Sequence, residues 1–198
     1  MRTMRYALPT VLLIFAAACA KSPQAEVDAA QAALDSAKAA EAAEYAPESL
    51  TAAEDAMAKL DAEIQAQQGR FFMFRSYDQA KLDAQAAVEA ARVAATDAVA
   101  AKERARVAAS EVLTHANALL SEVSQMLAVA PAGKGTAMDI AALRGDLQSA
   151  SQILQEAQQA FDAGRYNEAT AKATGAVAAT EEVRAAIEQA RQARAGRT

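Results

Sequence analysis

The longest regular pattern in the chain is an apolar stripe that begins at Tyr77 and ends at Val129. Its members recur at alternating steps of three and four residues, and only His115 and Glu122 interrupt their apolar character. They are Tyr77, Ala80, Ala84, Ala87, Ala91, Ala94, Ala98, Ala101, Ala105, Ala108, Val112, His115, Leu119, Glu122, Met126 and Val129. This period is typical of a helix packed along its length against other helices. It predicts one helix over 76–130, which at 1.5 Å per residue would be about 80 Å long.

Shorter helices are predicted on both sides of this long helix. A first helix runs from Pro23 to about Tyr45, and a second begins at Pro47 and ends at Gly69, because Pro suits a first helical turn and Gly follows a last one. A Gly-rich segment at 131–135 stops the long helix. A fourth helix then follows a predicted cap at Thr136 and ends at Gly164, and a fifth runs over 166–196.

An internal repeat connects the two halves of the chain. Glu26, Val27, Ala33, Leu34 and Ser36 match Glu111, Val112, Ala118, Leu119 and Ser121 in the same order. The long helix then serves as the last helix of one repeat and the first of the next. We therefore expect an all-α protein, an elongated antiparallel rod of two three-helix bundles that share the central helix, similar to spectrin repeats.

The composition agrees with an all-helical class. Alanine supplies 59 of the 198 residues, Trp is absent, and only nine residues are Phe or Tyr. Alanine buries little area, so we expect a thin core stabilised by many weak contacts. The expected domains are a signal peptide at 1–18, a lipidated N-terminus and short linker at 19–23, and helical repeats at 24–108 and 109–198.

The N-terminus has the pattern of an export signal. Arg2 and Arg5 precede an apolar run from Leu8 to Phe15, which is too short to span a bilayer. Ala16-Ala17-Ala18-Cys19 follows and resembles the lipobox of bacterial lipoproteins, which implies a signal peptide cleaved before a Cys that carries acyl chains such as palmitate. Ala20, in place of Asp, implies transfer to the outer membrane. The alternative is ordinary signal cleavage, which would leave Cys19 as a free thiol.

The first repeat resembles a family of helical bacterial lipoproteins whose shared domain has no known function. The resemblance covers about 24–108 and depends on Ala46-Pro47-x-x-Leu50 and Tyr77-x-x-Ala80-x-x-x-Ala84. It implies a location in the cell envelope, facing the periplasm.

Charge and residue chemistry argue against several function classes. The net charge is −5, and removal of the leader, with its two Arg, makes it −7, which disfavours nucleic acid as a partner. His115 is the only histidine and no Cys can join it, so we expect a half-buried packing residue and no metal site. We predict no catalytic residue, no cofactor and no enzymatic activity.

One local feature is not explained by composition. The loop Arg70, Phe71, Phe72, Met73, Phe74 and Arg75 gathers three of the five phenylalanines between two arginines. Two interpretations remain open: the rings cap the end of a bundle, or they contact a membrane or a protein partner. A capping box of Ser76 and Gln79 is predicted just after the loop.

These observations favour a non-enzymatic structural or adaptor lipoprotein, a helical rod anchored to the outer membrane at Cys19 and projecting into the periplasm. Its predicted partners are the membrane and either an envelope protein or a second copy of the chain. The alternative is a periplasmic carrier or chaperone that binds a peptide or a hydrophobic ligand in a helical groove, which requires bulky apolar residues facing solvent.

Overall fold

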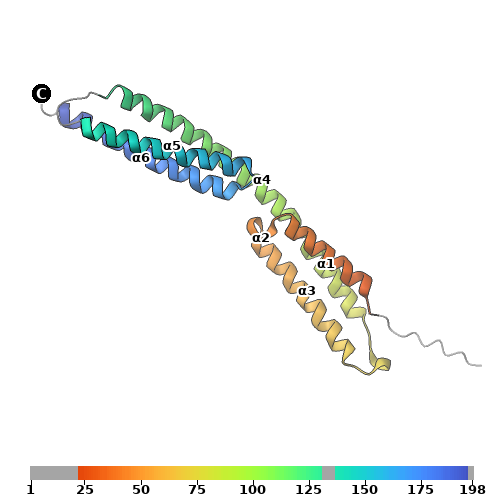
Figure 1. Ribbon diagram of the computed structural model, residues 1–198. Coiled ribbons are helices and arrows are strands. Elements are labelled where there is room, and N and C mark those ends of the chain that lie inside the picture. Colours follow the sequence, from red (N-terminus) through yellow and green to blue (C-terminus); the bar gives the residue numbers. More distant parts are fainter. Residues whose placement is uncertain (1–21, 131–136, 196–198) are drawn as a thin grey trace, which may run out of the picture. The chain divides into compact units, whose positions relative to one another are not determined.

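The computed structural model describes residues 22–130 and 137–195 (Figure 1). In these residues the secondary structure is entirely helical: α1 (Gln24–Ala39), α2 (Ala42–Tyr45), α3 (Pro47–Gln68), the 3-10 turn η1 (Phe72–Phe74), α4 (Asp78–Ala128), α5 (Ala137–Asp162) and α6 (Tyr166–Ala195). The all-α class is therefore confirmed. The predicted signal peptide, Cys19 and the predicted cap at Thr136 lie outside the described residues.

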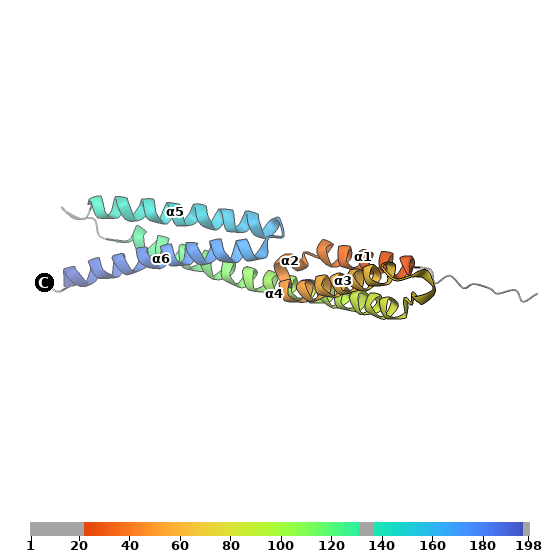
Figure 2. The same cartoon turned by 90° about the horizontal axis from the view of Figure 1, so that it is seen from below.

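The described helices form two compact units that share α4. The first contains residues 22–39 and 47–94, and the second contains 40–46, 95–130 and 137–195. Each unit is a bundle of three long helices: α1, α3 and the first part of α4 in one, and the last part of α4, α5 and α6 in the other (Figures 1 and 2). The repeat boundary at 108 and 109 stays a prediction.

The core of the first unit is made largely of alanine. Its buried apolar side chains are Ala30, Leu34 and Ala37 of α1, Leu50, Ala53, Met57 and Leu60 of α3, and Tyr77, Ala80, Ala84, Ala87, Ala91 and Ala94 at or after the start of α4. An ion pair of 2.9 Å joins Lys38 near the end of α1 to Glu54 near the start of α3, so these two helices are antiparallel. The alanine positions let the three helix backbones approach closely.

The first predicted helix is wrong in its extent, because it breaks before Tyr45. Glu41 adopts a left-handed conformation, with φ 61° and ψ 33°, and α2 restarts after it as a single turn. A left-handed conformation costs a non-glycine residue about 1–2 kcal/mol. The Glu41 carboxylate accepts a hydrogen bond of 2.6 Å from Lys102, and Ala42 is fully buried, so contacts within the second unit stabilise the break.

The long helix is confirmed, as α4 spans 51 residues without interruption. The predicted stripe is buried from Tyr77 to Ala98. Beyond Ala105, Leu119 is buried as predicted, but the other buried positions are one residue later than the stripe. They are Ala109, Leu113, Ala116, Val123 and Leu127. Ala108 and His115, which the stripe placed in the core, are exposed.

The shift in the stripe has a geometric cause. Alternating steps of three and four average 3.5 residues per turn, whereas an α-helix has 3.6, so the stripe drifts by about 20° per heptad. Over the four heptads from Tyr77 to Ala105 the drift reaches about 80°, close to the 100° between consecutive residues. The buried position therefore moves forward by one residue.

The second unit has larger side chains in its core. One cluster contains Leu113, Leu154 and the alanines around them, and another contains Leu119, Val123, Leu127, Val183 and Ile187. A third consists of Ala109, Ala160 and Ala169, one from each helix of the bundle, with Phe161 and Tyr166 packed beside them. The fourth and fifth predicted helices are confirmed as α5 and α6.

The turn between α5 and α6 ends α5 as predicted at Gly164. The amide of Gly164 bonds to the carbonyl of Phe161 at 2.9 Å, and that of Arg165 to Ala160 at 2.9 Å. These are the two hydrogen bonds of a Schellman motif, which needs a left-handed residue at this position. Gly164 supplies it with φ +77°.

Candidate functional site

The aromatic loop, residues Arg70 to Arg75, connects α3 to α4 at one end of the first unit (Figure 1). Gly69 and Arg70 close the last turn of α3 through hydrogen bonds to Gln65 and Gln67, each of 3.1 Å. The chain then makes the short turn η1, in which the Phe74 amide bonds to the Phe71 carbonyl at 2.9 Å. The loop is therefore an ordered turn.

The apolar side chains of this loop face water. The exposed fractions are 62% for Phe71, 59% for Phe72, 68% for Met73 and 70% for Phe74. The rings also contact one another, with centroids 4.6 Å apart for Phe71 and Phe72 and 6.4 Å apart for Phe71 and Phe74. This exposure excludes the interpretation in which the three rings fill the end of the bundle. They form an apolar cluster on the surface.

Polar side chains hold the base of the aromatic loop. Arg75 donates from Nε to the Arg70 carbonyl and from Nη2 to the Gln68 carbonyl, both at 2.9 Å. Gln67, only 5% exposed, accepts from the Ser76 amide at 3.1 Å and donates to Glu63 at 2.8 Å. Both ends of the loop are thus tied to the last turns of α3, while the Arg70 side chain is exposed.

The two arginines that the sequence placed together therefore have different roles. Arg75 has a structural role that sequence reasoning missed, because its guanidinium is occupied by main-chain carbonyls. Gln67 was also missed, since a Gln near a helix end has no distinctive pattern. Arg70 remains the cation of the loop that is available to a ligand.

The predicted capping box at the start of α4 is only half correct. Ser76 Oγ accepts from the Asp78 amide at 3.4 Å, as a cap would. Gln79 does not reach back to Ser76; its amide donates instead to Asp83 at 3.0 Å. Asp83 is nearly buried, and its strongest partner is Lys59 of α3 at 2.8 Å, so Gln79 is drawn toward this ion pair.

The Lys59 ion pair also sets the protonation of Asp83. The hydrogen bond from Lys59 lowers the pKa of the Asp83 carboxyl below its ordinary value of 3.8, and Gln79 acts in the same direction, against the effect of burial. The carboxylate is ionised at neutral pH and joins α3 to α4 two turns from the aromatic loop.

His115 does not have the half-buried packing role that was predicted. Its side chain is exposed, because the buried positions of α4 have moved to Leu113 and Ala116. Within 22–130 and 137–195, no group of three His, Cys, Asp or Glu side chains is placed to hold a metal ion.

A second polar region, which the sequence did not reveal, surrounds α2. Lys102 bonds to Glu41, and its ammonium lies 5.8 Å from the ring centroid of Tyr45. The Tyr45 hydroxyl is buried and makes no hydrogen bond of acceptable geometry. Burial raises the pKa of Tyr45 above its ordinary value of 10.0, and Glu44 adds to this, while the nearby backbone of Tyr166 acts in the opposite direction. Tyr45 therefore stays neutral at physiological pH.

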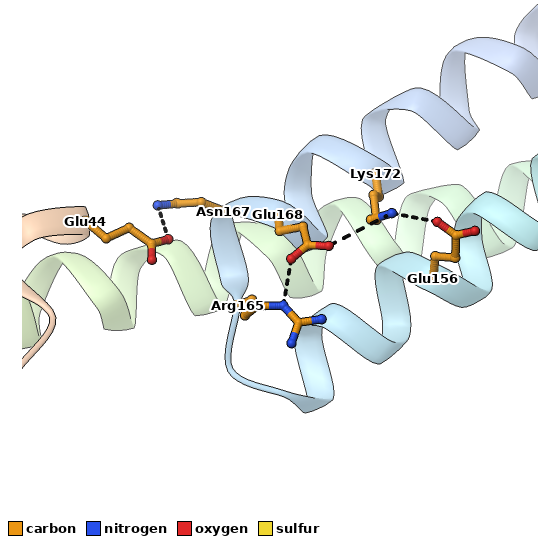
Figure 3. Close-up of polar contacts among 6 residues, drawn as sticks. All are labelled: Glu44, Glu156, Arg165, Asn167, Glu168 and Lys172. Carbon is orange, nitrogen blue, oxygen red and sulfur yellow. Dashed lines mark hydrogen bonds and ion pairs between the residues drawn. The ribbon is translucent and has the colours of Figure 1, made fainter.

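The same region continues onto the surface of the second unit (Figure 3). Asn167 donates to Glu44 of α2 at 2.9 Å, and Lys172 bonds to Glu156 of α5 at 2.6 Å. Arg165 bonds to Glu168 at 2.6 Å on the first turn of α6. These contacts join α2, α5 and α6, and each charged group already has a partner of opposite charge or an amide. This arrangement is typical of a structural surface network.

Two grooves among the described residues are open and mixed in character. In the first unit, α1 and α4 form one whose lining is Glu26, Ala29, Ala84, Gln85, Val88, Glu89 and Arg92. In the second unit, α4 and α5 form another, lined by Asn117, Leu120, Ser121, Ser124, Arg144, Leu147, Gln148 and Ser151. Neither concentrates bulky apolar side chains, so the aromatic loop is the strongest candidate for a functional surface.

Comparisons with known proteins return no match to a family model, a curated protein or a solved structure. As for spanning segments, none of the described helices combines the length and the apolar character needed to cross a membrane.

Proposed function

We propose that this protein is a non-enzymatic structural or adaptor lipoprotein, anchored at Cys19 to the outer membrane and facing the periplasm. The observation that carries the proposal is the aromatic loop, which offers four exposed apolar side chains on a hydrogen-bonded base. Such a surface is suited to binding, since it gathers apolar area and few groups able to transfer protons or electrons. The Cys19 pattern in the sequence adds the attachment to a membrane.

The carrier or chaperone alternative has less support. It requires a groove lined by bulky apolar residues, and the grooves described above contain serines, amides and charged groups beside one or two such residues. The helix seams are closed by alanines such as Ala91 and Ala94, which are fully buried. A hydrophobic ligand would find little apolar area there.

The anchor is tested by fractionating cells of a two-membrane bacterium that express the full chain. We expect the wild type in the outer membrane fraction, with labelled palmitate incorporated. Cys19→Ser should block lipoprotein processing, and the variant protein should no longer be found in the membrane fraction. Ala20→Asp is the matched control, because it should keep the label but retain the protein at the inner membrane. Wild-type protein without label, or a Cys19→Ser variant that partitions like the wild type, would refute the lipoprotein assignment.

A further inference from the structure

The position of the aromatic loop relative to the start of α1 indicates which surface can contact its exposed rings. Glu26 and Ala29, in the first turns of α1, line a groove with α4 residues between Ala84 and Arg92. The loop precedes Asp78, the first residue of α4, and Ala84 is six residues further on. At 1.5 Å per residue, the loop lies about 9 Å beyond the first turn of α1, on the side from which the chain enters α1.

The length of chain before α1 agrees with contact between this loop and a bilayer. Gln24 is five positions after Cys19 in the sequence. An extended chain covers at most about 3.5 Å per residue, so this segment can reach about 17 Å. That distance exceeds the 9 Å by which the loop extends past α1. A chain held in the bilayer at Cys19 can therefore place the loop at the bilayer surface without unfolding α1.

The chemistry of the loop also matches a lipid interface. No acidic residue occurs between Ile64 and Tyr77, while Arg70 contributes an exposed cation. Aromatic side chains favour the region between headgroups and acyl chains, and Arg favours anionic headgroups. A protein partner would need a pocket complementary to this particular ring cluster, whereas a bilayer accepts any apolar cluster at its surface.

The loop is also ordered before it binds. Arg75 and Gln67 fix its two ends, so contact with a bilayer would not require the backbone to lose further conformational freedom. The rings already contact one another, and together they present one apolar surface.

We propose that the aromatic loop inserts Phe71, Phe72 and Phe74 into the interfacial region of the bilayer that holds the lipid anchor. This inference rests on the proposed function, and it adds a second, non-covalent membrane contact. The loop would then fix the orientation of the first unit at the membrane, which a lipid on a short linker does not do alone.

The test uses a soluble form that starts at Ala20 and so contains every described residue but no anchor. Sedimentation with vesicles of phosphatidylethanolamine and phosphatidylglycerol should show binding. Changing Phe71, Phe72 and Phe74 together to Ser should weaken it at least about ten-fold, given the apolar area lost. The matched control changes Val99, Val107 and Val129 to Ser, three side chains that are also exposed, and should alter binding less than about two-fold.

Arg70→Gln distinguishes the contribution of the Arg70 charge to vesicle binding from the contribution of ring insertion. It should weaken binding to vesicles that contain phosphatidylglycerol about five-fold and leave binding to zwitterionic vesicles unchanged. Because the chain contains no Trp, Phe72→Trp gives a single reporter in the loop. Its emission should move to shorter wavelength with vesicles and become protected from an aqueous quencher, whereas that of Val99→Trp should not.

Several outcomes would overturn the inference. One is a soluble form that ignores vesicles, and another is a Phe72→Trp spectrum that vesicles leave unchanged. A third is a wild-type dimer in sedimentation velocity that the triple Phe variant converts to a monomer, because a second copy of the chain would then cover the rings. None of these results affects the Cys19→Ser experiment, so the proposal for the aromatic loop and the proposal for the lipid anchor can be refuted independently.

Discussion

Replacing alanine by leucine at two neighbouring positions of α4 tests how the second unit is packed. Ala109 is fully buried and meets Ala160 of α5 and Ala169 of α6, which are also fully buried. Ala108, one residue earlier, is exposed. The apolar stripe in the sequence predicted that Ala108 is buried and Ala109 is not. The two variants therefore distinguish the buried position seen in the structure from the one predicted by alternating steps of three and four.

The expected magnitudes follow from these contacts. Leu adds three carbon atoms at Ala109, where a small side chain from each of the other helices already closes the space. Accommodating them forces the backbones apart, which costs about 1–3 kcal/mol. Ala108→Leu places the same atoms in water and should change the free energy of unfolding by less than about 0.5 kcal/mol.

The measurement is urea unfolding followed by circular dichroism at 222 nm, with thermal melts as a second readout. For a chain of this size, each kcal/mol lowers the melting temperature by about 2–4 °C. If Ala108→Leu is the more damaging variant, the stripe keeps its alternating steps through the second unit, and the shift described for α4 is wrong. Equal effects would mean that neither side chain lies against α5 and α6.

Two further predictions concern stability. A methyl group at Gly145, in the middle of α5, would meet no atom within 4 Å, so Gly145→Ala should raise the free energy of unfolding by about 0.5–1 kcal/mol. Gly164→Ala should lower the free energy of unfolding by about 1 kcal/mol, because φ at this position is +77°. Equal urea midpoints for the two variants would refute both predictions. The lowered pKa of Asp83 means that this carboxylate stabilises the fold above about pH 3.8 and that the contribution is lost as pH falls through the folded-state pKa. Asp83→Asn should therefore cost about 1 kcal/mol at neutral pH, a modest value because Lys59 is 70% exposed. The difference from wild type should shrink as the pH falls below 3.8, whereas a cost independent of pH would mean that the charge is irrelevant.

The helices that the sequence predicted well are those with local stop and start signals. Pro47 and Gly69 bound α3, and Gly164 ends α5, because these residues act through their own backbone conformations. The extent of α4 followed from an unbroken run of good helix formers. In each case the information lies within a few residues of the feature.

The features that were missed depend on residues far apart in the chain. The break at Glu41 involves Lys102, and no local signal marks a left-handed Glu. The exposure of His115 depends on an angular drift that accumulates over several heptads. In the candidate site, the composition of the aromatic loop was predictable, but the binding of Arg75 to main-chain carbonyls required the folded geometry.

The alanine-filled seams also limit how this chain can change over generations. A fully buried position such as Ala91 or Ala94 admits a smaller side chain at the cost of a cavity, and a larger one only by separating the helices. The water-facing positions have no such restriction. Two chains could therefore keep this architecture while agreeing at little more than their buried alanines, and because alanine is common in every helix, such agreement would be a weak record of shared ancestry.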